Sequence, residues 1–266
     1  MKKTIKNILK RLDIFYEVKF SPFTQWYLEQ RNPSLKKQRA FDRQFFSELL
    51  GTNNQLIFDI GANQGHKTHI FRKLSKKVVS VDPDDTNFAI LNIRFKKNPD
   101  ITIIKKAVDA SNGESVLYIT EEGSGLNTMS NKWKDALSNT EESRWEHAIE
   151  YNKKVTVNTI TMGDLIRAFG TPDFIKVDVE GFEKNVISGI DTPVPLISFE
   201  CNLPEFYSES LWCVDHLHSL DNSYLFNAFD EKTWVFNDFI TYDQFRNWFV
   251  NENQKRYFEI FAKRSK

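Results

Sequence analysis

The chain has 266 residues, and its 36 Lys and Arg residues are balanced by 36 Asp and Glu residues. This length is enough to bury a substantial core, as one α/β domain with additions. The zero net charge excludes a global field that would attract nucleic acid or an anionic membrane. We therefore expect a small molecule that binds locally as the partner, and no nucleic acid.

The cysteine and hydropathy patterns indicate in which cellular compartment the protein is expected. Cys201 and Cys213 form neither a C-x-x-C pair nor a zinc-binding pattern, which indicates two reduced thiols. No apolar run approaches the roughly 20 residues that span a bilayer. The N-terminus has no signal-peptide pattern. These features predict a cytoplasmic protein without a membrane span.

The N-terminal residues have the pattern of helices. Ile5, Ile8 and Leu12 recur at helical spacing with lysines mostly elsewhere on the wheel, which predicts a basic amphipathic helix. Such a helix can make peripheral contact with a membrane, but docking on its own domain is our preferred interpretation. A second helix is expected over residues 35–50. We assign residues 1–54 to an N-terminal helical extension and residues 55–266 to the main domain.

From residue 55, short β-branched and aromatic runs alternate with helical segments, which predicts a doubly wound α/β sheet. The last two strands are expected to form an antiparallel pair, with a helix at 243–250 between them. The expected strands are 56–60, 78–82, 101–107, 115–120, 155–159, 174–179, 196–200, 224–229 and 257–262. The other expected helices are 65–74, 86–96, 162–169 and 182–187.

Residues 56–71, LIFDIGANQGHKTHIF, predict a strand, a glycine-containing turn and a helix. Gly61 and Gly65 lack Cβ atoms, so the backbone can approach a ligand closely while the N–H groups of the helix start face an anion. Asp82 ends the next strand about 20 residues further on, where an acid accepts hydrogen bonds from a ribose. The ligand is therefore expected to be a nucleoside derivative.

The loop spacing distinguishes between nucleoside ligands. A dinucleotide site would read G-x-G-x-x-G, whereas this loop reads G-x-N-x-G directly after D-x. We interpret this spacing as favouring S-adenosylmethionine, with its carboxylate at the helix start, its ammonium near Asp59 and its ribose near Asp82. The alternative is an ordinary strand-to-helix turn.

A second strand, turn and helix follow in PDFIKVDVEGFE, residues 172–183. Lys176, Asp178 and Glu180 alternate, so their side chains share one side of the strand. Three charges there are costly unless they are paired or lie at a ligand cleft. In one interpretation, Asp178 and Glu180 emerge beside a transferable methyl group, as a base or as ligands of Mg²⁺. In the other, Lys176 and Asp178 form an internal ion pair.

Other residues are candidates for binding the acceptor. Glu200 ends an expected strand, and His66 lies in the first turn of the helix after the glycine loop. Ser124 and Asn127 belong to GSGLN, which is expected to form a flexible edge of the cleft. The polar segment 131–154 either stacks on a sugar or anchors itself on the domain. Its candidates are Trp133, Trp145, His147 and Tyr151.

Six blocks occur in order between residues 56 and 200: FDIGANQG, SVDP, AVDASNGESVLYI, GSGLNTMS, VTVNTI and PDFIKVDVEGFE. Together they resemble the FkbM-type methyltransferases. The resemblance implies a class I methyltransferase (Rossmann-like) fold, S-adenosylmethionine as cofactor and O-methylation of hydroxyl groups. It assigns Asp59, Gly61, Asn63 and Gly65 to the cofactor loop, Asp82 to the ribose, and Ala107 with Val108 to the adenine wall. Two features depart from the family: Asp82 stands where Glu is usual, and segment 131–154 is longer than usual.

The expected function is S-adenosylmethionine-dependent O-methylation of a sugar, a glycan or a related metabolite. Asp178 is the preferred base, with Glu180 or Glu200 orienting the acceptor. If these acids bind Mg²⁺ instead, the ion would position the hydroxyl and lower its pKa. Two other classes remain open. One is a nicotinamide-dependent oxidoreductase, which the glycine spacing opposes, and the other is a noncatalytic nucleoside-binding module of the same fold.

Overall fold

The computed structural model describes residues 14–138, 148–230, 232–251 and 256–265. The amphipathic helix expected from Ile5 falls largely outside the described residues, as do Trp145 and His147. Among the described helices, none is long and apolar enough to cross a membrane.

The described residues of the N-terminal part form three helices, α2 (Phe15–Lys19), α3 (Pro22–Arg31) and α4 (Pro33–Leu50). Helix α4 confirms the helix expected at 35–50: the Asn32 side chain caps its first turn, and Gly51 follows its last residue. Helix α3 was not predicted from the sequence. It buries none of its residues, so it has no core-facing apolar stripe to recognise.

The central sheet has the order β10-β9-β11-β8-β7-β1-β2-β3 within the described residues. Its five consecutive strands from β3 to β8 pair in parallel, so their carboxyl ends meet at one edge. These strands are β1 (Asn54–Ile60), β2 (Ser75–Val81), β3 (Ile101–Ile104), β7 (Phe174–Val177) and β8 (Leu196–Leu203).

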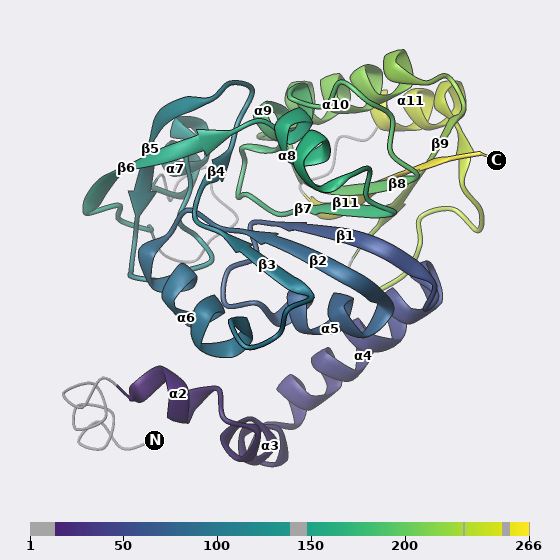
Figure 1. Ribbon diagram of the computed structural model, residues 1–266. Helices are drawn as coiled ribbons and strands as arrows, with labels where there is room; N and C mark the ends of the chain where they lie inside the picture. The colour runs from purple at the N-terminus through teal and green to yellow at the C-terminus, as the bar shows by residue number, and fades with distance from the viewer. Residues whose placement is uncertain (1–13, 139–147, 231, 252–255, 266) are drawn as a thin grey trace.

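Helices cover both faces of this sheet (Figure 1). On one face, Phe46 of α4 and Phe71 of α5 pack on Phe174 of β7. On the other face, a second cluster joins strand residues such as Phe58 to Leu165 and Val214. The helices on the first face are α4, α5 (His66–Leu74) and α6 (Asp85–Phe95), and those on the second are α8 (Met162–Phe169), α9 (Glu183–Ser188) and α10 (Tyr207–Leu220).

The C-terminal strands confirm the expected antiparallel pair. Strand β11 (Arg256–Arg264) lies between β8 and β9 (Tyr224–Phe229) and runs antiparallel to both. The short strand β10 (Ile240–Thr241) and helix α11 (Tyr242–Val250) form part of the connection between β9 and β11. The sheet is therefore mostly parallel, with an antiparallel C-terminal strand, as predicted.

Not all of the expected strands belong to the central sheet. Strands β4 (Ala107–Val108), β5 (Gly113–Ile119) and β6 (Lys153–Ile160) form a separate sheet of order β4-β6-β5. The strand expected at 101–107 is therefore two strands, β3 and β4, in two sheets. Half-exposed antiparallel strands such as β5 and β6 need only one covered face, so they do not have to join the buried parallel sheet.

The strand expected at 174–179 ends earlier, because the chain turns where it meets the glycine loop. The Asp178 N–H donates to the Ile60 carbonyl oxygen, and Gly61 follows with a φ of 78°. A Cβ atom on Gly61 would lie 1.7 Å from the Asp178 carbonyl oxygen. Glycine at position 61 is therefore what lets the β1 loop and the segment after β7 come together.

Replacing Gly61 with Ala should lower the free energy of unfolding by more than about 3 kcal/mol, because a backbone clash adds to the strain of a positive φ. Gly51→Ala is the matched control, since Gly51 has a φ of 62° but a Cβ atom there would meet nothing within 4 Å. Urea unfolding of both variants measures the difference. Equal losses in the two variants would contradict the importance of this close approach.

Candidate functional site

A cavity of about 260 Å³ lies at the carboxyl ends of the parallel strands. Its wall brings together residues from β1, β2, the small sheet, the segment 124–129 and the turn after β7. Among the residues predicted from the sequence, it contains Gly61, Asn63, Asp82, Ala107, Val108, Ser124, Asn127, Asp178, Glu180 and Glu200.

The glycine loop is fixed to the end of β2 by its own backbone. The N–H groups of Gly61 and Ala62 both donate to the Val81 carbonyl oxygen, at 2.9 and 3.1 Å. Asn63 then takes a φ of 49°, and its N–H donates to Asp82 Oδ2 at 2.7 Å. The loop therefore presents Gly61 and Asn63 to the cavity.

Gly65 and Asp59 support this loop from behind and do not line the cavity. A Cβ on Gly65 would lie 2.5 Å from the Phe95 ring, so this glycine lets the start of α5 pack on α6. Asp59 is buried, and its Oδ2 accepts a hydrogen bond from the Thr68 hydroxyl at 2.5 Å. Burial raises the pKa of Asp59 to about 6, and the hydrogen bond from Thr68 opposes this shift.

Asp82 is the acid of the cavity wall at the end of β2. It accepts N–H bonds from Asn63 on Oδ2 and from the Asp84 backbone on Oδ1, and burial raises its pKa to about 7. Asn87 also donates to Asp82 Oδ1, at 3.3 Å. The Asn87 Oδ1 atom is buried and has no hydrogen-bond partner among the described residues. It therefore offers an acceptor to a ligand in the cavity.

Asp84 and Asn87 were not predicted as site residues. Asp84 caps α6, because its Oδ1 accepts the N–H groups of Thr86 and Asn87 at 2.8 and 2.9 Å. An acid followed by a helical pattern is the usual sequence signal of such a cap, so Asp84 was recognisable in principle. Asn87 carries no comparable signal, since its role depends on how α6 lies beside β2.

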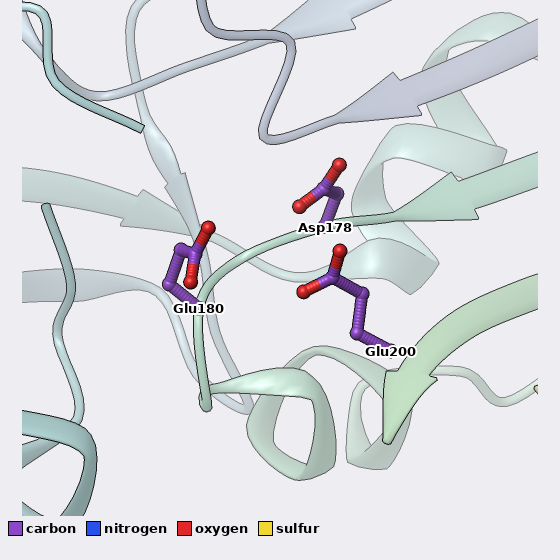
Figure 2. A group of neighbouring side chains, drawn as sticks. All are labelled: Asp178, Glu180 and Glu200. Atoms are coloured by element: carbon purple, nitrogen blue, oxygen red, sulfur yellow. The ribbon is translucent and has the colours of Figure 1, made fainter. Parts of the chain in front are cut away.

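Three carboxylates gather at one end of the cavity (Figure 2). Asp178 and Glu180 follow β7 and Glu200 lies on β8, and one oxygen of each lies within 4.8 Å of the others. We call these three residues the acid group. Glu180 has a φ of 55°, and its carbonyl oxygen accepts the Thr128 hydroxyl at 2.6 Å, so an unusual backbone conformation aims this side chain.

Lys176 lies beneath the acid group and is 3 % exposed. Its Nζ lies 3.1 Å from Asp178 Oδ2 and 3.5 Å from Glu259 Oε1. Burial alone would lower the pKa of Lys176, but the carboxylates of Asp178, Glu259 and Glu200 outweigh it and raise this pKa. The internal ion pair considered from the sequence is therefore present, and its Asp178 also faces the cavity.

The other two acids are held differently. Burial and the nearby Asp178 charge raise the pKa of Glu180 and of Glu200. The Tyr257 hydroxyl donates to Glu200 Oε1 at 2.7 Å. The site thus combines one carboxyl group that is paired with an ammonium and two carboxyl groups whose pKa values are raised.

Tyr257 and Glu259 on β11 were missed as contributors to this site. Sequence separation hid them: Glu259 pairs with Glu200 only through the register of β11 against β8. No local motif around residues 257–259 indicates that pairing.

The remaining candidates lie in different places. Asn127 donates to Asp84 Oδ2 at 3.0 Å and accepts the Thr120 N–H at 2.9 Å, so it fixes the cavity edge. The Ser124 hydroxyl oxygen accepts the Leu126 N–H at 3.2 Å in the same segment. His66 lies outside the cavity, in a second groove near Phe20.

The polar segment after residue 130 begins with α7 (Asn131–Ser138). Trp133 is buried, with its ring 5.6 Å from that of Phe206, and a Cβ on Gly181 would lie 2.9 Å from Trp133 Cβ. Tyr151 donates its hydroxyl to the Leu126 carbonyl oxygen at 2.9 Å. These contacts favour anchoring of the segment on the domain.

The acid Glu183, next to the acid group, predicts a pH dependence of stability. It is buried and accepts the N–H groups of Val179 and Gly181, and burial raises its pKa to about 7. The pKa of a glutamate in an unfolded chain is about 4.3. Between these two values the folded chain binds the extra proton, so this group's contribution to stability decreases as pH rises through that window.

The free energy of unfolding should therefore decrease less from pH 5 to pH 8 in Glu183→Gln than in the wild type. The difference between these two decreases should be up to about 3 kcal/mol. Urea unfolding at both pH values measures this. Glu114→Gln, at an exposed position of β5, is the control that should retain the wild-type slope. A wild-type slope in Glu183→Gln would show that this carboxyl group does not titrate in the window.

Comparison with known proteins identifies the family of the chain. A model described as the methyltransferase FkbM domain matches residues 59–230. No curated protein matches the chain.

Three solved structures match the chain at low sequence identity. A methyltransferase FkbM from Methylobacillus flagellatus KT is 16 % identical over 82 % of this chain and 46 % of that one, with a TM-score of 0.48. The chain thus spans about half the length of that relative. A precorrin-6y C5,15-methyltransferase from Geobacter metallireducens GS-15 is 11 % identical over 85 % of this chain and 88 % of that one, with a TM-score of 0.42. The plantazolicin methyltransferase BpumL, in complex with SAH and a monoazolic desmethylPZN analogue, is 10 % identical over 99 % of this chain and 100 % of that one, with a TM-score of 0.43.

The family match includes the glycine loop, Asp82 and the acids after β7, and it extends from the end of β1 to the end of β9. The mostly parallel sheet with its antiparallel C-terminal strand agrees with the class I methyltransferase fold expected from the sequence blocks. The chain belongs to the methyltransferase FkbM domain family.

Proposed function

We propose that the chain transfers a methyl group from S-adenosylmethionine to a hydroxyl group of a sugar, a glycan or a related metabolite. The observation that carries the proposal is the acid group at one end of a cavity whose other walls include the glycine loop and Asp82. The family supports the cofactor, and the acids support a hydroxyl acceptor. Two buried thiols, Cys201 and Cys213, agree with a reducing, cytoplasmic setting.

The cavity has features that suit this cofactor. Gly61 offers a backbone without a side chain, and the unpartnered Asn87 Oδ1 offers an acceptor. Asp82 Oδ2 accepts one protein N–H, which leaves a lone pair for a ribose hydroxyl. The residues that would hold the cofactor are Gly61, Asn63, Asp82, Ala107 and Val108. When bound, S-adenosylmethionine supplies an activated methyl group.

The chain's own contribution is to position the acceptor and to take its proton. Asp178 lies 3.1 Å from the Lys176 ammonium and lines the cavity, so its carboxylate is the group that we assign to accept the proton. Glu180 and Glu200, whose carboxyl oxygens lie within 4.8 Å of that of Asp178, orient the acceptor oxygen.

Binding of Mg²⁺ is the alternative use of these acids. Carboxylate oxygens are its usual protein ligands, and those of the acid group lie within 4.8 Å of one another. However, the Lys176 ammonium lies 3.1 Å from Asp178 and already compensates part of the negative charge. A second cation beside it would be repelled, so we favour the base.

Asp178→Asn should lower turnover by about two to four orders of magnitude, because the amide keeps the side-chain shape but cannot take the proton. Transfer of labelled methyl from S-adenosylmethionine to a panel of sugars and glycans measures this. Cofactor affinity should stay near the wild-type value. Asp191→Asn, at an exposed acid near α9, is the matched control.

Three results would contradict this assignment. Full activity of a folded, cofactor-bound Asp178→Asn protein would remove Asp178 from the chemistry. Loss of wild-type activity with chelator, and recovery with magnesium, would assign the acid group to a metal. A lowered melting temperature with normal activity per folded molecule would leave Asp178 only as the partner of Lys176.

Cofactor affinity should fall as pH decreases from 8 to 6. Burial raises the pKa of Asp82 to about 7, and this group accepts ribose hydrogen bonds best when it is ionised. Below this pKa a proton must leave before the cofactor binds, so affinity should fall by up to about tenfold per pH unit.

Asp82→Asn should bind more weakly at pH 8 and lose most of the pH dependence. Asp85→Asn, at an exposed acid of α6, should match the wild type in calorimetric titrations. An Asp82→Asn protein with a wild-type pH profile would exclude Asp82 as the ribose acceptor.

A further inference from the structure

A second groove, of about 930 Å³, lies between the N-terminal helices and the helices α5 and α6. It shares no lining residue with the cavity of the acid group. Its walls include Phe20 after α2, Arg39 of α4, His66 of α5 and Arg94 of α6. The N-terminal helices therefore form one wall of a second groove on the molecule.

The charges around this groove do not balance. Among its acids, Glu29 is paired with Arg39 at 2.9 Å, and Asp42 is paired with Lys67 at 2.7 Å. Glu17 is the remaining acid of the lining. Four further cations of the lining have no carboxylate within 4.0 Å among the described residues: Arg43, Arg94, Lys96 and Lys97. The groove thus carries an excess of positive charge.

Arg94 is the most constrained of these cations. Its guanidinium carbon lies 4.8 Å from the ring centroids of both Phe20 and Phe95, and it donates a hydrogen bond to the Gln64 carbonyl oxygen. Burial lowers its pKa to about 10, and Arg39 adds to this shift. A half-buried guanidinium without a carboxylate is costly, because its desolvation is not compensated by an opposite charge.

Burial, with nearby cations as a second cause, lowers the pKa values of the two histidines at the groove. Desolvation, followed by Arg94 and Arg39, lowers the pKa of His66 to about 4. Desolvation, followed by Lys73 and Arg94, lowers the pKa of His69. Both imidazoles are therefore neutral at pH 7 and can donate one hydrogen bond each without adding charge.

We propose that this groove is a binding site for a phosphate-bearing ligand, with Arg94 as its central contact. A guanidinium held between two aromatic rings presents a fixed, planar fork of N–H groups, which matches the geometry of phosphate oxygens. Phosphate or pyrophosphate carries the two or more negative charges that would balance Arg43, Arg94, Lys96 and Lys97. A single carboxylate would leave most of this charge uncompensated.

The site is independent of the proposed methyl transfer but lies next to the cofactor loop. Gln64 belongs to that loop, and it receives hydrogen bonds from Arg94 on its backbone and from Lys19 on its side chain. The phosphate can belong to a soluble phosphorylated molecule or to a lipid headgroup, since both present the same chemistry. The experiment below distinguishes these two sources.

The test uses the full chain and two probes. The first probe is inorganic pyrophosphate in calorimetric titration, and the second is sedimentation with phosphatidylcholine vesicles, with and without phosphatidylglycerol. Arg94→Gln and Arg43→Gln should each weaken binding of the effective probe by about tenfold or more, because a charge-assisted hydrogen bond is lost. Lys76→Gln removes one charge at an exposed position outside the groove and should leave binding unchanged.

Melting temperatures are recorded for every variant, and if Arg94→Gln does not fold, Arg43→Gln and Lys97→Gln decide the result. Saturable pyrophosphate binding that these variants weaken supports a soluble ligand. Variant-sensitive binding to phosphatidylglycerol vesicles alone supports a headgroup. Absence of binding to both probes, or binding that Lys76→Gln weakens as much as the groove variants, would overturn the proposal.

Discussion

The buried ammonium of Lys176 is the interaction on which the proposed site depends. It lies between Asp178, at the end of β7, and Glu259, on β11, and so it joins the middle of the sheet to the last strand of the chain. Without this cation, Asp178, Glu200 and Glu259 would be a group of mutually repelling acids in a poorly solvated place. The antiparallel strand β11 therefore does more than complete the sheet: it supplies Glu259 to Lys176 and Tyr257 to Glu200.

A close approach of two backbones brings the other half of the site to these acids. Gly61 leaves space for the Asp178 carbonyl group, so the glycine loop and the turn after β7 meet directly. The loop is also held from its far side, where Arg94 and Lys19 bind Gln64, while the Gln64 amide donates to the Gly123 carbonyl oxygen at 3.2 Å. Through Gln64, the N-terminal helices contribute to the position of a loop that faces the cavity.

Features set by short-range chemistry were predictable from the sequence. The spacing of Gly61, Gly65 and Asp82, and the alternation of Lys176 with Asp178, indicated a ligand site at the ends of adjacent strands, and the structure brings most of these residues together. Features set by the pairing of distant segments were not predictable. The apolar run from residue 101 crosses from one sheet to another at Lys105 and Lys106, and Glu259 meets Lys176 only through strand register. The groove around Arg94 likewise depends on which helices of the domain the N-terminal extension packs against, and the sequence indicates only that it docks on the domain.

Calorimetric titration of the full chain with S-adenosylmethionine, and separately with NAD, tests the proposed cofactor most directly. The G-x-N-x-G loop, the Asp82 carboxylate and the unpartnered Asn87 oxygen suit one adenosine unit joined to an amino acid, without a pyrophosphate. We expect saturable binding of one S-adenosylmethionine per chain and no binding of NAD. Binding of NAD, or absence of binding to S-adenosylmethionine by the folded chain, would contradict the proposed methyl transfer.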